Sequence, residues 1–137
     1  MKIENFAGCL IIENGKVLLV QEKHKEAYGL WSLPLGHSEE NENEKETAIR
    51  ETKEETGLNV SLDKNKTLEL QGREFKSTSN FDDNIINLTI FQAKITGGSL
   101  CIGNDILDIK WFSVDELNQI QLRGEWIKYF VDKLGYK

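Results

Sequence analysis

The sequence is poor in proline and cysteine and has no long apolar run, and each shortage excludes a class of protein. One proline, 39% hydrophobic residues and no monotonous stretch exclude collagen-like, mucin-like and wholly disordered chains. Cys9 and Cys101 lie too far apart, and too far from other ligands, for a disulfide framework or a zinc site, so we expect both to be buried. An apolar run such as residues 17–20 is far shorter than the roughly 18 residues of a membrane-spanning helix. We therefore expect a single domain over residues 1–137 that does not cross a membrane.

Basic residues are also in the minority, because 17 Lys and Arg stand against 23 Asp and Glu, a net charge of -6. This balance disfavours binding to a nucleic-acid backbone. The first residues include Glu4 and Asn5 before any hydrophobic stretch and offer no small-residue cleavage site, so we expect a cytoplasmic protein. Between residues 39 and 55, eight carboxylates stand against three cations, whereas the rest of the chain has fifteen acids and fourteen bases. We therefore expect a positively charged partner at this segment.

Alternating apolar residues and turn signals predict a sheet. Asn14-Gly15 between two apolar segments is a strong hairpin signal, and Pro34 ends a short strand. The expected strands cover residues 7–13, 16–21, 31–33, 58–62, 67–76, 85–95 and 106–112, with turns at 80–84 and 96–99.

Two main helices are predicted as well. Asn41 with Glu44, or Asn43 with Glu46, forms a capping box at the start of a helix that Gly57 ends. The later helical segments cover residues 114–117 and 123–134. This inventory predicts an α+β fold in which helices cover a mixed sheet.

The second half of the first helix carries three carboxylates on one arc. At about 100° per residue, Glu54 lies roughly 60° to one side of Glu51, and Glu55 lies roughly 40° to the other. The face that we expect to pack against the sheet carries Ala48, Ile49, Thr52 and Thr56. A hard cation such as Mg²⁺ would relieve the repulsion among the acids, but a run of Glu is usually a solvated helix face. On charge alone, both interpretations stay open.

A longer pattern favours the cation. Residues 36–58 read GHSEENENEKETAIRETKEETGL and fit the pattern G-x5-E-x7-R-E-U-x-E-E-x-G-U, where U is aliphatic. Its fixed positions are Gly36, Glu42, Arg50, Glu51, Glu54, Glu55 and Gly57. This segment resembles the Nudix hydrolase box, and the opening hairpin, residues 31–34 and residues 109–117 look like the small MutT-type members of that family.

Three residues depart from the family pattern. Thr52 stands where an aliphatic residue is usual, and Leu35 and Asn41 stand where many members have glycine. Because Thr52 is close to valine in shape, we expect slightly weaker packing and no loss of chemistry. Leu35 is expected to narrow the loop around the phosphates and so to affect substrate preference.

The resemblance implies an α/β/α sandwich with a central mixed sheet, and an enzyme. Its reaction would be the metal-dependent hydrolysis of a nucleoside diphosphate linked to another moiety, with a nucleoside triphosphate as the first expectation. The cofactor would be Mg²⁺, with Mn²⁺ as a substitute, and the partner a small-molecule nucleotide. The implied metal ligands are Gly36, through its carbonyl, Glu51, Glu54 and Glu55.

The resemblance also implies roles for the polar residues. Glu54 or Glu51 is expected to accept the proton of the attacking water. Asp105 is a competing candidate, and its alternative role is that of a turn residue. We expect Arg50 to brace a carboxylate and Glu42 to orient the loop before the helix.

Aromatic and histidine residues are weaker candidates. Trp31 or Phe81 could stack on a base, although tryptophans are more often part of the core. His24 and His37 are expected to be exposed loop residues.

Other functions stay open from the sequence. The chain could be a Nudix-fold module that binds a nucleotide without cleaving it, an acidic interaction domain with no ligand, or a hydrolase for ADP-ribose or a dinucleoside polyphosphate. The last two substrates are disfavoured, because Glu74-Phe75-Lys76 stands where those subclasses tend to show a Pro or a Tyr. The oligomeric state is open, a homodimer included.

Overall fold

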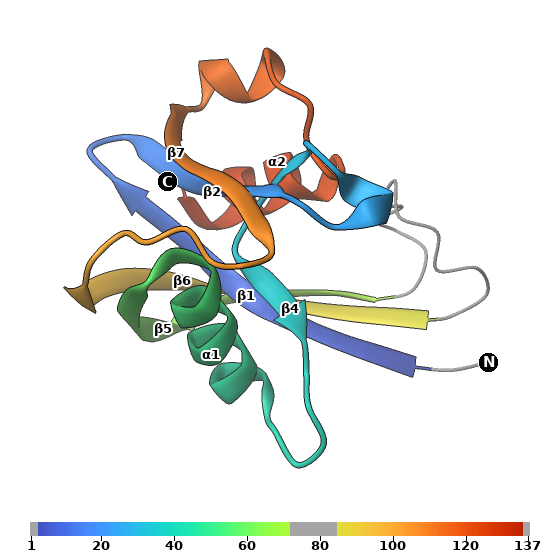
Figure 1. Ribbon diagram of the computed structural model, residues 1–137. Coiled ribbons are helices and arrows are strands. Elements are labelled where there is room, and N and C mark those ends of the chain that lie inside the picture. The colour runs from blue at the N-terminus through green and yellow to red at the C-terminus, as the bar shows by residue number, and fades with distance from the viewer. Residues whose placement is uncertain (1–2, 72–84, 136–137) are drawn as a thin grey trace.

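The chain folds around one mixed sheet. The computed structural model describes residues 3–71 and 85–135 (Figure 1). The strands are β1 (Ile3–Glu13), β2 (Lys16–Glu22), β3 (Trp31–Ser32), β4 (Leu35–His37), β5 (Leu58–Gln71), β6 (Ile85–Gly98) and β7 (Ile106–Ser113). The helices are α1 (Glu44–Thr56) and α2 (Trp126–Phe130), with short helical turns η1 (Lys25–Ala27), η2 (Asp115–Asn118) and η3 (Val131–Gly135). Within the two described ranges, no helix has both the length and the apolar character needed to cross a membrane.

Most predicted elements are present, and a few differ. The sequence does not predict β4, and β5 is one strand where two are predicted. The turn predicted at 96–99 is wrong for all but Ser99, because β6 continues to Gly98 and pairs there with Leu58. α2 begins at Trp126 rather than at 123, because the backbone of residues 121–123 is held to Trp31 instead. The turn predicted at 80–84 lies outside the described residues.

β1 lies at the centre of the sheet. It pairs in parallel with β6, from Ile3 with Ile85 to Ile11 with Ala93, and antiparallel with β4 and, at the hairpin, with β2. β2 also pairs with β3 and β7, and β5 pairs with β6, all antiparallel. The sheet is therefore mixed, as predicted.

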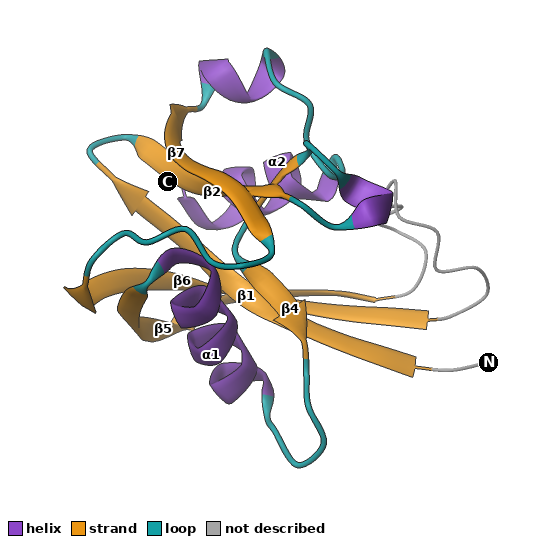
Figure 2. Cartoon of the chain, viewed as in Figure 1, coloured by secondary structure: helices purple, strands orange, loops and turns teal. Residues whose placement is uncertain are grey.

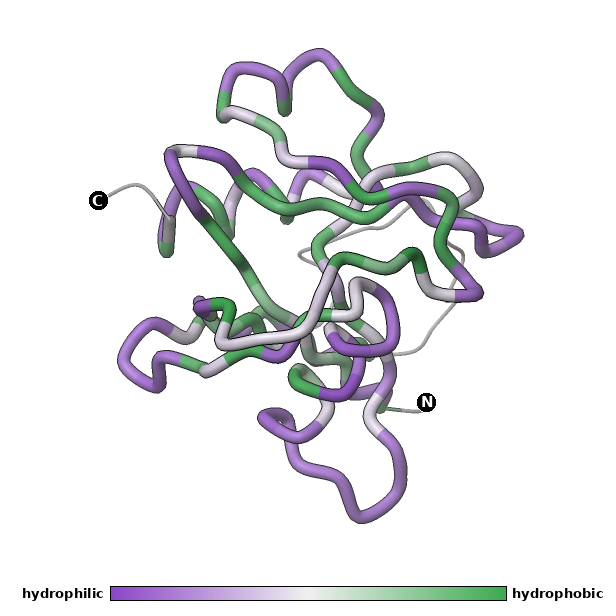
Figure 3. Tube along the Cα trace, turned by 60° about the vertical axis from the view of Figure 1, so that its left-hand side comes forward, coloured by the Kyte–Doolittle hydropathy of each residue, from purple (hydrophilic) through white to green (hydrophobic). Residues whose placement is uncertain are grey.

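Helices cover both faces of this sheet, and the fold is the expected α/β/α sandwich (Figure 2). Alternation along β1 directs Cys9 and Ile11 to a cluster with Ala48 of α1, and Leu10 to a cluster with Phe130 of α2. Burial of a large side chain such as Phe130 contributes about 1.5–3 kcal/mol. Figure 3 shows hydrophobic stretches in the central strands and hydrophilic loops around them.

Two side chains are more exposed than predicted. Ile49 is 42% exposed, because Ala48 and Thr52 occupy the contact between α1 and the sheet. Cys101 is exposed in the loop after β6, whereas Cys9 is buried as predicted.

Local chemistry sets both ends of α1. Asn43 Oδ1 accepts a hydrogen bond from the Glu46 N–H at 2.8 Å, and Glu46 Oε1 accepts one from the Asn43 N–H at 3.0 Å. This capping box starts the helix at Glu44, so the second of the two predicted starts is correct. Asn41 has a φ of 70°, a left-handed conformation that Asn tolerates and glycine adopts freely. Gly57, with a φ of 79°, ends the helix.

Candidate functional site

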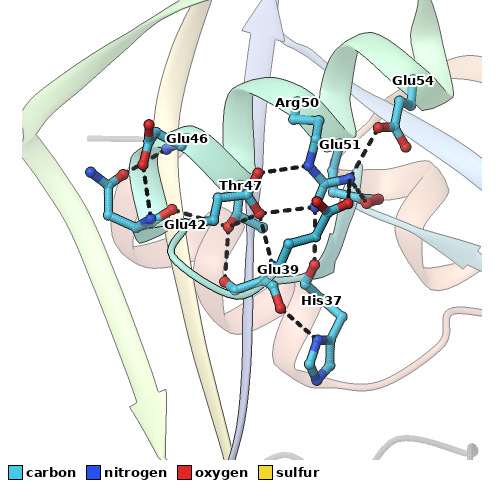
Figure 4. Close-up of polar contacts among 10 residues, drawn as sticks. His37, Glu39, Glu42, Glu46, Thr47, Arg50, Glu51 and Glu54 are labelled. Carbon is cyan, nitrogen blue, oxygen red and sulfur yellow. Dashed lines mark hydrogen bonds and ion pairs between the residues drawn. The ribbon is translucent and has the colours of Figure 1, made fainter.

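The guanidinium group of Arg50 lies at the centre of the site (Figure 4). Its Nε and Nη2 donate to the two oxygens of Glu42 at 2.7 and 3.0 Å. Its Nη1 donates to Glu51 at 2.8 Å and to Glu54 at 3.0 Å, and Nη2 also donates to the His37 carbonyl at 3.1 Å. These five bonds engage all five N–H groups of the side chain. Arg50 therefore fixes carboxylates from α1 against the loop that precedes it.

Glu42 ties that loop to the helix. Besides the bonds from Arg50, its Oε1 accepts hydrogen bonds from Thr47 Oγ1 at 2.7 Å and from the Glu39 N–H at 3.0 Å. The bonds from Arg50, and then the one from the Glu39 backbone, lower the pKa of Glu42 to about 2. The carboxylate therefore stays charged at ordinary pH and holds the loop in one place.

The carboxyl group of Glu51 lies directly against Gly36. A Cβ atom at position 36 would stand 2.1 Å from both Cδ and Oε2 of Glu51. Glycine is needed here for this close approach, and the pairing of Gly36 with Ala7 in β1 fixes its backbone. An acid of α1 and the backbone of β4 thus meet with no side chain between them.

Glu55 occupies an enclosed position. Its carboxyl group accepts a hydrogen bond from the Leu35 backbone and meets the Glu51 carboxyl group, yet its buried Oε1 has no hydrogen-bond partner. Burial, followed by the negative charges of Glu22 and Glu51, raises the pKa of Glu55 well above its usual value. Burial also raises the pKa of Glu51, against the effect of Arg50. A cation would relieve this crowding of buried acids.

The donor set suits a hard cation, although it is not yet gathered around one point. Across the described residues, no three carboxylate, histidine or cysteine side chains form a ready set of metal ligands. Glu51 and Glu55 meet each other, whereas Glu54, with 57% of its side chain exposed, points to Arg50 and would have to leave it to join them. The donors are all oxygens, and one of them, Glu55 Oε1, lacks a partner. Both features fit Mg²⁺ or Mn²⁺.

Asp105 lies in a turn between β6 and β7. The Ile106 N–H donates to the Gly103 carbonyl at 3.2 Å, and the Asp105 carbonyl accepts a hydrogen bond from the Lys23 N–H at 3.1 Å. The Gly103 N–H donates to the Glu55 carbonyl at 3.2 Å. The turn role named as the alternative for Asp105 is therefore present, and the turn links the last part of α1 to the end of β2.

Trp31, one of the two aromatic candidates, contributes little exposed surface. Trp31 is 8% exposed, and its ring packs edge-on against Phe112 with 4.8 Å between the centroids. The structure thus favours the core role of Trp31 over stacking on a base. Phe81 lies outside the described residues. His24 and His37 are exposed as predicted, but the loop prediction is wrong for His37, which is the last residue of β4 and pairs with Phe6.

Two charged residues that the sequence analysis does not single out also lie at this site. Glu22, at the end of β2, is 7% exposed, and Arg123 Nη1 donates to its Oε2 at 2.8 Å. The negative charge of Glu22 is among the causes that raise the pKa of Glu55. The available signal was a charged residue two positions after the apolar run 17–20, but its partner is 101 positions away in the sequence.

The site geometry can be compared with known proteins. A family model described as the NUDIX domain matches residues 3–134. A protein named putative nudix hydrolase 1, from Caenorhabditis elegans, is 32% identical over 135 residues, which cover 93% of this chain and 34% of that protein. A putative 8-oxo-dGTP diphosphatase from Bacillus subtilis is 32% identical over 114 residues, which cover 80% of this chain and 68% of that protein. The chain thus spans about a third of the first relative and about two thirds of the second.

Solved structures share the fold. The crystal structure of a UDP-X diphosphatase superposes with a TM-score of 0.79 and 22% sequence identity, covering 98% of this chain and 62% of that one. At this identity the likeness concerns the arrangement of the strands and helices.

Proposed function

Because the chain belongs to the Nudix hydrolase family, we propose that it hydrolyses a diphosphate linkage of a nucleotide with the help of a divalent cation. Among substrates, we place a nucleoside triphosphate first, as for MutT-type members. The name of the Bacillus subtilis relative, a diphosphatase for a nucleoside triphosphate, supports this order. The structural observation that carries the proposal is the buried, unpartnered Oε1 of Glu55 beside the Glu51 carboxyl group.

The cation would be held by the residues that the sequence pattern singles out. Glu51, Glu54, Glu55 and the carbonyl of Gly36 would bind Mg²⁺, or Mn²⁺ in its place. When bound, the cation neutralises phosphate oxygens and acidifies a water molecule.

The protein itself supplies alignment and a proton acceptor. Arg50 holds Glu51 and Glu54 at 2.8 and 3.0 Å, so both carboxylates stay close together on α1 until Glu54 leaves this pair to join the cation. Glu54, with more than half of its side chain exposed, accepts a proton from the attacking water. The water oxygen bonds to phosphorus, and the bridging P–O bond breaks to release pyrophosphate and a nucleoside monophosphate. We assign this role to Glu54 over Asp105, because Arg50 holds the Glu54 carboxylate beside that of Glu51, whereas the contacts of Asp105 in its turn come from its backbone.

A single substitution tests the proposal. Glu54→Gln keeps the size of the side chain and removes the proton acceptor, so we expect hydrolysis to fall by about 10²-fold or more. Glu44→Gln, on the first turn of the same helix, is the matched control and should keep full activity. Nucleotide hydrolysis with product identification is the assay. Full activity of the Glu54→Gln variant would contradict the proposed mechanism.

The same hydrolysis assay ranks the candidate substrates by kcat/KM. Nucleoside triphosphates, ADP-ribose and dinucleoside polyphosphates are compared at equal concentration with Mg²⁺ and with Mn²⁺. We expect the highest kcat/KM for a triphosphate. Tight nucleotide binding without turnover of any compound would instead favour the module that binds nucleotides without cleaving them.

A further inference from the structure

The ion pair between Glu22 and Arg123 lies inside the protein. The two side chains are only 9% and 13% exposed, with 2.8 Å between Arg123 Nη1 and Glu22 Oε2. Removing two charges from water is costly, and their mutual attraction often fails to offset that cost. Stability alone therefore does not account for the position of this pair.

Alternation along β2 places Glu22 on the face of the sheet that α1 covers. Leu18 belongs to the core cluster that contains Ala48 of α1, and Glu22, four residues further along, shares its face. The irregularity in the pairing of β2 with β7 adds its extra residue to β7, between Ile106 and Asp108, so the alternation of β2 is preserved.

Backbone hydrogen bonds bring Glu22 close to Glu55. The turn after β6 donates from Gly103 to the Glu55 carbonyl at 3.2 Å and accepts from Lys23 at the Asp105 carbonyl, 3.1 Å away. Three residues of this turn thus bridge Glu55 and the residue that follows Glu22. The ends of α1 and β2 are held side by side.

The backbone of Arg123 is held in place by β3. Its backbone N–H donates to the Trp31 carbonyl at 2.8 Å, and the Trp31 N–H donates to the Gln121 carbonyl at 2.9 Å. The segment before α2 is thus fixed along β3. The guanidinium group reaches Glu22 from a backbone that is itself anchored.

We propose that Glu22 and Arg123 belong to the cation-binding site as positioning residues, with Glu22 attracting the bound cation and Arg123 offsetting that attraction. This inference rests on the proposed function. The unpartnered Oε1 of Glu55 supports it, because an enclosed carboxyl oxygen without a partner points to a ligand between the acids. The negative charge of Glu22 also acts directly on Glu55.

The proposal predicts opposite effects for the two partners. Glu22→Gln removes a negative charge next to Glu55 and keeps the positive charge of Arg123, so it should weaken Mn²⁺ binding by about tenfold. Arg123→Gln removes the compensating positive charge and should strengthen Mn²⁺ binding by a similar factor at a pH that keeps Glu22 ionised, because burial raises the pKa of Glu22 and Arg123 lowers it. The double variant restores the local charge and should bind within about threefold of the unsubstituted protein. Arg123→Lys keeps the charge and should bind almost unchanged.

The experiment titrates Mn²⁺ alone into the full, chelator-stripped protein and follows free Mn²⁺ by electron paramagnetic resonance. A urea unfolding curve is measured for each variant, as a check that the variant is folded at the titration temperature. If Arg123→Gln does not fold, the comparison of Glu22→Gln with the double variant and Arg123→Lys still decides the question. The matched control is the exposed pair Glu125 and Lys128, 3.5 Å apart, whose Gln variants should not change Mn²⁺ affinity.

If Glu22 and Arg123 only hold the two segments together and do not act on the cation through their charges, the Mn²⁺ titrations give a different result. Unchanged Mn²⁺ affinity in Glu22→Gln, or a shift of the same sign in Glu22→Gln and Arg123→Gln, would overturn the inference. If the unsubstituted protein binds Mn²⁺ and hydrolyses nucleotides while these variants bind equally well, only this inference fails. If the unsubstituted protein binds no Mn²⁺, the proposed function fails with it.

Discussion

Replacing Gly36 by alanine adds one methyl group where β4 meets Glu51. The new Cβ atom would stand 2.1 Å from Cδ and Oε2 of Glu51, whereas ordinary van der Waals contact begins at 3.4 Å. Pairing with β1 holds the backbone of β4, so the flexible Glu51 side chain has to move. The required displacement is about 1 Å, the scale on which a misplaced group can cost about 10²-fold in rate.

We therefore expect Gly36→Ala to lower kcat for nucleotide hydrolysis by about 10²-fold. The free energy of unfolding should change by less than about 1 kcal/mol, because a side-chain end moves and the core is untouched. The measurements are steady-state kinetics and urea unfolding on the same preparation.

Gly97→Ala is the control for this substitution. There an added Cβ atom would meet only Asn59 Nδ2, at 3.6 Å, so neither rate nor stability should change much. A Gly36→Ala variant with an unchanged kcat would show that the position of Glu51 does not limit the reaction. A fall in kcat that merely followed a fall in stability would equally refute the reasoning.

Three further predictions concern stability and reactivity. Arg50 holds the pKa of Glu42 at about 2, below its unfolded value of 4.5. The ionised carboxylate therefore adds stability that is fully present above pH 4.5 and is lost as the pH falls towards 2. In the Glu42→Gln variant, urea midpoints measured across that pH range should fall less. Asn43→Ala removes the capping box of α1 and should cost about 1 kcal/mol in urea unfolding, and an unchanged midpoint would contradict the role of the cap. Burial raises the pKa of Cys9 to about 11, whereas Cys101 is exposed. A thiol reagent should therefore label one cysteine in the folded protein and two in urea. Labelling of both cysteines in the folded protein would contradict the burial of Cys9.

Local signals predicted the parts of the fold that depend on neighbouring residues. Asn14 and Gly15 both have positive φ, at 53° and 75°, as a tight hairpin turn requires. Gly57 ends α1 for the same conformational reason. In both places a few adjacent residues decide the backbone conformation, so the sequence contains the whole cause.

Long-range contacts account for what the sequence did not predict. β4 has three residues and exists because Gly36 and its neighbours pair with β1, a contact that no local pattern signals. Ile49 follows the helical periodicity of a packing residue, yet Ala48 and Thr52 occupy the contact with the sheet and Ile49 stays exposed. Glu22 and Arg123 are ordinary charged residues in the sequence, and only the folded chain brings them together.

The parallel pairing of β1 with β6 has a consequence for the order in which the molecule assembles. During synthesis, residues 3–11 emerge long before their partners at 85–93, and α1 is complete before β5 and β6 exist. The edge of β1 that pairs with β6 therefore stays unpaired until most of the chain has left the ribosome. Contacts between such distant segments form slowly, so a destabilised β6 should leave newly made chains prone to aggregation even where the finished protein is stable.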